Sequence, residues 1–224
     1  MEIKEACLSY SIVSLVYQIT IITIMYLCNI SPISSKSITT FLMVFIPLSM
    51  IGCYVLIKLL HSKVSSIKKR KDSFSEVMLL VFTLASFLAG SVLFHVVSIL
   101  LGAPLIENVE ETFSLSMLCS ALTVVPLFIT HDGRWDDFLS YLPETTYVQD
   151  SLSDCIKMVS AFTVIGAWAG AFPIPLDWDR DWQTWPITCC IGALSGQIVG
   201  LCFSILSCAG IIPSSPPNWK NKIT

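Results

Sequence analysis

The side chains of this sequence best suited to chemistry are six carboxylates in two short segments: Glu107, Glu110, Glu111, Asp177, Asp179 and Asp181. Carboxylate oxygens are the ligands that hard cations prefer, so a metal site is one interpretation. A zinc centre would also need imidazole or thiolate ligands, and neither segment contains them. The alternative is that acids are favourable near a helix N-terminus and in solvated loops. We therefore predict neither a metal site nor a cofactor.

The first segment begins with Gly102 and Pro104. Proline suits the first turn of a helix, because its missing N–H costs nothing there. A helix from this point would place Glu107, Glu110 and Glu111 on one face.

The second segment carries one base, Arg180, between Trp178 and Trp182. Its guanidinium could pair with the neighbouring aspartates, or bind a phosphate-bearing headgroup or an acidic group of a partner. Tryptophans in such a position are typical of a membrane interface. Six residues are our candidates for contacts outside the chain: Glu107, Glu110, Asp177, Trp178, Arg180 and Trp182.

No residues are arranged for covalent catalysis. There is no Gly-x-Ser-x-Gly turn, and no spacing of serine, histidine and acid suggests a triad. His95 lies in an apolar stretch, where an ionisable side chain is often functional. The alternative for His95 is a neutral imidazole satisfied by a neighbouring helix. We predict no catalytic residues, and hence a protein that is not itself an enzyme.

The elements that would position these residues are membrane helices. Of the 224 residues, 54% are hydrophobic and only 13% are charged, whereas soluble domains average about 25% charged residues. Six apolar stretches have the length of about 20 residues that crosses a bilayer: 8–28, 38–60, 76–101, 108–130, 154–173 and 186–208. The prediction is an all-α, polytopic membrane protein, with residues 1–224 in a single integral membrane domain.

The basic residues predict the topology. Five of them lie between the second and third spans: Lys63, Lys68, Lys69, Arg70 and Lys71. The positive-inside rule places this loop in the cytosol. Six spans then put both termini in the cytosol and both acidic segments on the lumenal side. Because the one basic run serves orientation, we predict no nucleic-acid partner.

Glycines in the last two spans recur every four residues: Gly166 and Gly170 in one, Gly192, Gly196 and Gly200 in the other. In a bilayer this spacing lets helix backbones approach closely, and close packing then holds them together. The pattern predicts a helical hairpin whose five glycines pack against the helices of a partner.

The C-terminal residues include a candidate localisation signal. Lys220 and Lys222 stand fifth and third from the end, which resembles the dilysine retrieval signal of endoplasmic-reticulum membrane proteins. Such signals are read by a receptor and are not anchors. We therefore expect a multi-pass protein of the endoplasmic-reticulum membrane. Asn29 begins a formal glycosylation sequon whose occupancy stays open.

Two stretches are long enough to compare with known families. One is GAPLIE (102–107) with ETF (111–113) close behind, and the other is GAWAGAFPIPLDWDRDWQTWPITC (166–189). Together with Phe94-His95-Val96, they resemble the two signature regions of the phosphatidylinositol-glycan biosynthesis class F (PIG-F) family.

The resemblance implies a non-catalytic stabilising subunit of the ethanolamine-phosphate transferases that build glycosylphosphatidylinositol (GPI) anchors. These enzymes transfer ethanolamine phosphate from phosphatidylethanolamine to mannoses of the GPI precursor, and their catalytic domain is lumenal and belongs to the large partner. The implied partners are these large subunits and membrane lipid, and contact with the GPI precursor or phosphatidylethanolamine is a further candidate.

Two other functions remain open from the residues alone. One is a helper that translocates lipid or another solute, suggested by His95, Arg180 and the glycine-rich helices. The other is a small intramembrane enzyme that uses Glu107, Glu110, Asp177 and Arg180.

Overall fold

The computed structural model describes residues 2–28, 35–64, 76–131, 133–135, 152–176 and 180–211. Six α-helices make up most of this part of the chain, and each is long and apolar enough to cross a membrane. They are α1 (Glu2–Leu27), α2 (Ser35–Val64), α3 (Glu76–Leu100), α4 (Val109–Thr130), α6 (Leu152–Ala169) and α7 (Ile187–Cys208), with the short 3-10 helix η2 (Asp181–Gln183) before α7. The predicted all-α architecture with six spans is confirmed.

The helix ends differ from the prediction where polar residues or prolines intervene. Helices α1 and α2 begin before their apolar stretches. Helix α6 ends at Ala169 and not near residue 173. The chain continues from there in turns, in which Phe172 N–H donates to the Ala169 carbonyl and Ile174 N–H to the Ala171 carbonyl. Pro173 explains the early end, because proline disfavours a helical conformation in the residue before it.

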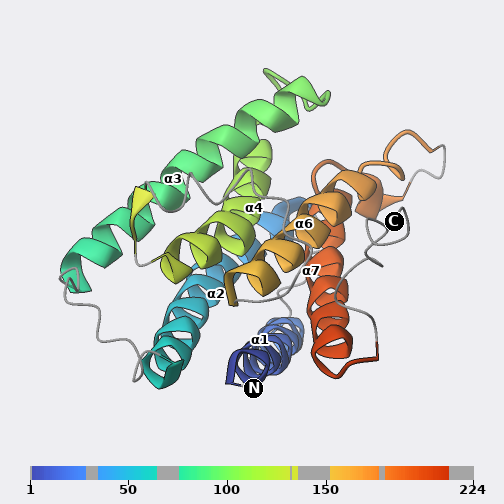
Figure 1. Ribbon diagram of the computed structural model, residues 1–224. Coiled ribbons are helices and arrows are strands. Elements are labelled where there is room, and N and C mark those ends of the chain that lie inside the picture. Colours follow the sequence, from blue (N-terminus) through green and yellow to red (C-terminus); the bar gives the residue numbers. More distant parts are fainter. Residues whose placement is uncertain are drawn as a thin grey trace, which may run out of the picture.

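Helix α4 lies at the centre of the bundle. In its most apolar window 78% of the residues are buried, compared with 28–50% in the other five helices. It packs against α2, α3 and α6, and Figure 1 shows it between α3 and α6. Small polar residues let its neighbours approach, as where the Ser120 hydroxyl donates to the Phe87 carbonyl of α3 at 2.7 Å.

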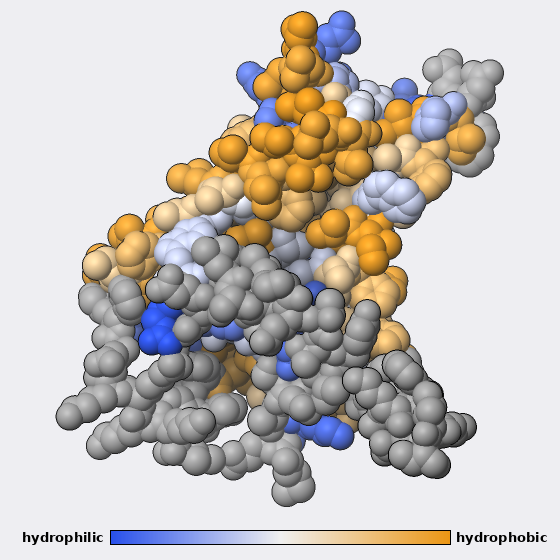
Figure 2. All heavy atoms as spheres, turned by 45° about the horizontal axis from the view of Figure 1, so that its top comes forward, coloured by the Kyte–Doolittle hydropathy of each residue, from blue (hydrophilic) through white to orange (hydrophobic). Residues whose placement is uncertain are grey.

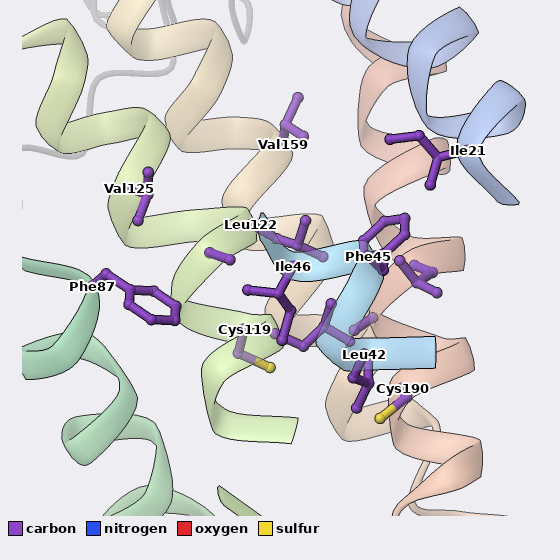
Figure 3. Packing of buried hydrophobic residues seen from close by; sticks show 14 of the residues in the cluster. Ile21, Leu42, Phe45, Ile46, Phe87, Cys119, Leu122, Val125, Val159 and Cys190 are labelled. Carbon is purple, nitrogen blue, oxygen red and sulfur yellow. The ribbon is translucent and has the colours of Figure 1, made fainter. Parts of the chain in front are cut away.

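An apolar core fills the space between α4 and its neighbours. Phe41 and Phe45 of α2 stack with ring centroids 5.5 Å apart, and both are almost fully buried. Figure 3 shows Phe45 and Ile46 of α2 in this core, near Leu122 of α4.

Helix α3 is the most peripheral of the six. Its main packing partner is α4, and its outer face exposes large apolar side chains such as Leu84, Leu88 and Val92. Figure 2 shows hydrophobic side chains gathered over the upper part of one face of the molecule. Such a surface is what a helix in contact with lipid chains presents.

Polar contacts inside the bundle tie α1 to α7. The Gln18 amide Nε2 donates to Oε1 of Gln197 at 2.6 Å, and the Ser11 hydroxyl donates to Ser204 at 2.9 Å. Hydrogen bonds between helices in an apolar medium hold them in a defined pairing. They join the first of the described helices to the last of them.

Candidate functional site

Helices α6 and α7 touch backbone to backbone along their five glycines, a contact that we call the glycine seam. A Cβ atom on Gly166 would lie 2.8 Å from the Cα atom of Gly196. One on Gly192 would lie 3.0 Å from the Cα atom of Gly170, and one on Gly200 equally close to the Cα atom of Val159. Real Cβ atoms keep a greater distance from backbone atoms, so only glycine fits this seam.

The glycine seam differs from the prediction that these glycines pack against a partner. The space left by each missing side chain is filled by the other helix of the same chain. Gly170, for example, lies against Thr188 and Cys189. The four-residue spacing indicates close helix packing, but it is the same whether the second helix belongs to the chain or to another protein.

One side chain organises the hairpin loop, which we define as residues 171–176 and 180–186. The Gln183 amide Nε2 donates to the carbonyls of Pro173 at 2.8 Å and Leu176 at 2.9 Å. Its Oε1 accepts from the backbone N–H of Arg180 at 2.9 Å. Because Gln183 is buried, these three bonds satisfy backbone groups that water reaches poorly. Both sides of the loop are thereby held in one arrangement.

The connection from α3 to α4 is a compact turn. Gly102 has φ of 106°, a conformation that favours glycine, and its N–H donates to the Ile99 carbonyl at 3.0 Å to end α3. Asn108 has φ of 56° and precedes α4. Glu107 therefore lies in the turn and not on a helix, which corrects the prediction that it shares a helical face with Glu110. Glu110 does lie in the first turn of α4, where a carboxylate is favourable.

A hydrogen bond joins the turn region to the hairpin loop. The indole Nε1–H of Trp185 donates to the Thr112 hydroxyl oxygen at 2.9 Å. The Thr112 hydroxyl in turn donates to the Asn108 carbonyl at 2.9 Å, and this threonine is fully buried. The two sequence segments that resemble a known family thus meet at one end of the bundle.

Sequence reasoning missed the three residues that make these contacts: Thr112, Gln183 and Trp185. The available signal was their chemistry, because each is a polar or amphipathic side chain beside an apolar span. Buried tryptophan N–H groups usually find a hydrogen-bond partner.

Four of the six predicted contact residues lie in the described segments around this junction. Glu107, Glu110 and Arg180 are exposed, whereas Trp182 is half-buried against the core. Asp177 and Trp178 lie outside the described residues, as do Lys220, Lys222 and Asn29. In the part of the chain that the structure describes, no group of three or more histidine, cysteine, aspartate or glutamate residues could hold a metal ion.

His95 lies on α3 near the same end. Its ring packs edge-on against Phe113 of α4, with ring centroids 5.7 Å apart. Its Nδ1 atom is buried and has no hydrogen-bond partner within the described ranges. The interpretation of an imidazole satisfied by a neighbouring helix is not met at this nitrogen.

Two adjoining cavities separate α3 from α6, and we call them together the α3–α6 groove. One, of about 540 Å³, extends to the turn at Gly102 and to Trp185 of the hairpin loop. The other, of about 690 Å³, runs along the middle of the bundle and reaches Lys157. Phe94 and Val164 line both cavities. The groove therefore continues from the junction of the two loops along most of α6, with α4 beneath it.

Comparison with known proteins identifies relatives of the chain. The sequence model of the GPI biosynthesis protein family Pig-F matches residues 6–205. The chain is 45% identical over 123 residues to a Mus musculus protein named GPI ethanolamine phosphate transferase, stabilizing subunit, covering 54% of either chain. It is 43% identical over 123 residues to the Homo sapiens protein of the same name, again covering 54% of each.

A fungal relative extends the match. Glycosylphosphatidylinositol anchor biosynthesis protein 11 of Debaryomyces hansenii is 36% identical over 155 residues, which cover 69% of this chain and 65% of that protein. The matched segments thus span between half and two thirds of the length of these relatives. No solved structure shows a significant match. With the family match covering residues 6–205, the chain belongs to the GPI biosynthesis protein family Pig-F.

Proposed function

We propose that this chain is a non-catalytic stabilising subunit of GPI ethanolamine-phosphate transferases in the endoplasmic-reticulum membrane. The observation that carries the proposal is the family match together with the printed name of the mammalian relatives, a stabilizing subunit of that transferase. The partner would be the large catalytic subunit, which transfers ethanolamine phosphate from phosphatidylethanolamine to mannoses of the GPI precursor.

The structure supports this role through the rigidity of its hairpin end. The glycine seam fixes α6 against α7, Gln183 fixes the hairpin loop, and Trp185 fixes that loop to α4. Exposed Glu107, Glu110 and Arg180 surround this end. A surface that is already ordered loses little conformational entropy when a partner docks on it. We assign this end to the lumenal side, because the basic run between α2 and α3 favours a cytosolic loop at the other end.

Complementation combined with purification tests the proposal. We would express the chain in cells that lack their own family member, and measure GPI-anchored proteins at the surface by flow cytometry. The expected result is restored surface display, with one large transferase retained when the chain is purified in mild detergent. Restored display without a retained transferase would contradict a stabilising role.

Variants of the exposed charged residues distinguish a stabilising subunit from a small enzyme. The triple variant Glu107→Gln, Glu110→Gln, Arg180→Gln should lower both the retained transferase and its steady-state level, if these residues contact the partner. Loss of GPI maturation with an unchanged, fully associated transferase would instead favour the small-enzyme alternative.

The membrane orientation and the retrieval signal are tested by separate measurements. A glycosylation acceptor placed in the hairpin loop should be modified, whereas one placed after Thr224 should not. Lys220→Ser with Lys222→Ser should shift the chain to later secretory compartments. A modified C-terminal acceptor would overturn the assigned orientation and would remove the basis of the retrieval signal.

A further inference from the structure

We propose that the α3–α6 groove is the seat of one membrane-spanning helix of the large partner. This inference rests on the proposed function and assigns its interface within the membrane. The groove reaches Gly102 and Trp185 of the two loops, but the charged candidates Glu107, Glu110 and Arg180 do not line it.

The length of the groove favours a helix over a lipid chain. Its α3 wall runs from Ser86 to Leu101, which is about 22 Å at 1.5 Å per residue. One leaflet contributes only about 15 Å of a hydrocarbon core that is about 30 Å thick. A groove longer than one leaflet matches an occupant that crosses the midplane, as a spanning helix does.

The walls of the groove are lined by small residues on both sides. Ala89 and Ser98 belong to the α3 wall, and Ala161 and Ala167 to the α6 wall, with Ala171 in the turn after α6. Small side chains let a third helix approach the backbones of α3 and α6 closely enough for extensive dispersion contacts. The charged residue of the lining, Lys157, lies in the second turn of α6, near the end of the groove.

Ser160 provides an independent indication that the groove is incomplete. Its side chain is only 7% exposed and lines the groove, yet its hydroxyl has no hydrogen-bond partner among the described residues. Other buried hydroxyls of the bundle donate to their own helix, as Thr163 does to the Val159 carbonyl and Ser116 to the Thr112 carbonyl. The Thr188 hydroxyl also has no partner among the described residues, but it does not line the groove. A polar group on a seated helix would satisfy the Ser160 hydroxyl.

Photo-crosslinking in native membranes tests the seat directly. A benzoylphenylalanine would replace Leu93, which lines the groove and is 59% exposed, or Leu88, which is 57% exposed on the same helix and lies outside the groove. We expect position 93, and not position 88, to give an adduct with the large transferase. An adduct at position 93 with lipid alone, or with a second copy of this chain, would overturn the inference.

Association of matched variants gives a second readout. Leu93→Trp should lower the retained transferase about tenfold, because the added ring overpacks a close helix contact. Leu88→Trp adds the same bulk at a position of similar exposure outside the groove, and this variant should still retain the transferase. If both variants retain the transferase equally, the groove is not where the partner's helix binds, and the proposed function stays intact. A wild-type chain that retains no transferase would instead overturn the function, and the seat with it.

Discussion

The two long sides of α6 make a natural comparison. On one side Gly166 and Gly170 meet α7 so closely that no side chain fits between the helices. On the other side Ala161 and Val164 line the α3–α6 groove, which has a volume large enough for side chains of another helix. Both sides carry small residues, yet one is filled by the chain itself and the other is open.

The difference shows what small residues do and do not specify. They permit close approach, but the approach stabilises a pair of helices only where a second surface is present to supply dispersion contacts. For α6 that surface is α7, the next helix along the chain. Across the groove α3 packs on α4 and leaves the space beside α6 unfilled.

The largest expected effect comes from forcing the filled side apart. Gly196→Leu places a side chain against the backbones of Phe162 and Gly166, which cannot move aside as a flexible side chain would. We expect a loss of about 3 kcal/mol or more in stability, in the upper range for overpacking. Ser195→Leu, at an exposed neighbouring position, should be nearly neutral. The monodisperse yield and the melting temperature in detergent are measured for both variants. Equal values for Gly196→Leu and Ser195→Leu would contradict the close packing of the glycine seam.

A smaller loss should follow when the hairpin loop is released. Gln183→Leu removes three hydrogen bonds to backbone groups at similar volume. With each bond worth about 1 kcal/mol and water replacing some of them, we expect a loss of about 2 kcal/mol. Thr184→Val removes one exposed bond to the Asp181 carbonyl and should cost less. Thermal unfolding compares the two variants, and a larger loss for Thr184→Val would exclude the organising role of Gln183.

The bond between the hairpin loop and α4 should contribute less again. Trp185→Phe keeps an aromatic ring but removes the donor to Thr112, for an expected loss of about 1 kcal/mol. Trp168→Phe is the control, because Trp168 is an exposed indole of the same region. A double-mutant cycle with Thr112→Val should show a coupling of similar size. If the losses of Trp185→Phe and Thr112→Val simply add in the double variant, the hydrogen bond does not hold the hairpin loop to α4 in solution.

The smallest effect belongs to the open side. Ser160→Ala removes a hydroxyl without a partner among the described residues, so the isolated chain should be as stable as the wild type or slightly more stable. If a helix is seated in the groove, association should weaken by about 0.6 kcal/mol, roughly threefold. The melting temperature of the free chain measures the effect on stability, and the amount of retained transferase measures the effect on association. A marked loss of stability in the free chain would place Ser160 in the fold and not at an interface.

The sequence was informative where hydropathy and spacing act locally. Runs of apolar residues marked all six helices, and the glycine spacing of the last two indicated that they pack closely. It could not show which helix the glycines face. The bond from Trp185 to Thr112 spans 73 residues, and no local pattern encodes such a contact. The groove depends on how far α3 and α6 diverge over α4, which is a property of the whole bundle.

The periodic glycines of α7 have a consequence for alignment. Because Gly192, Gly196 and Gly200 repeat every four residues, sliding α6 by one glycine spacing, about 6 Å at 1.5 Å per residue, would again set glycine against glycine. The seam therefore fixes how near the two helices lie, but more than one register satisfies it. The hydrogen bonds of Gln183 hold the chain between the helices at one length and thereby select one register. Separation is encoded in the membrane helices, and alignment is encoded in the loop that joins them.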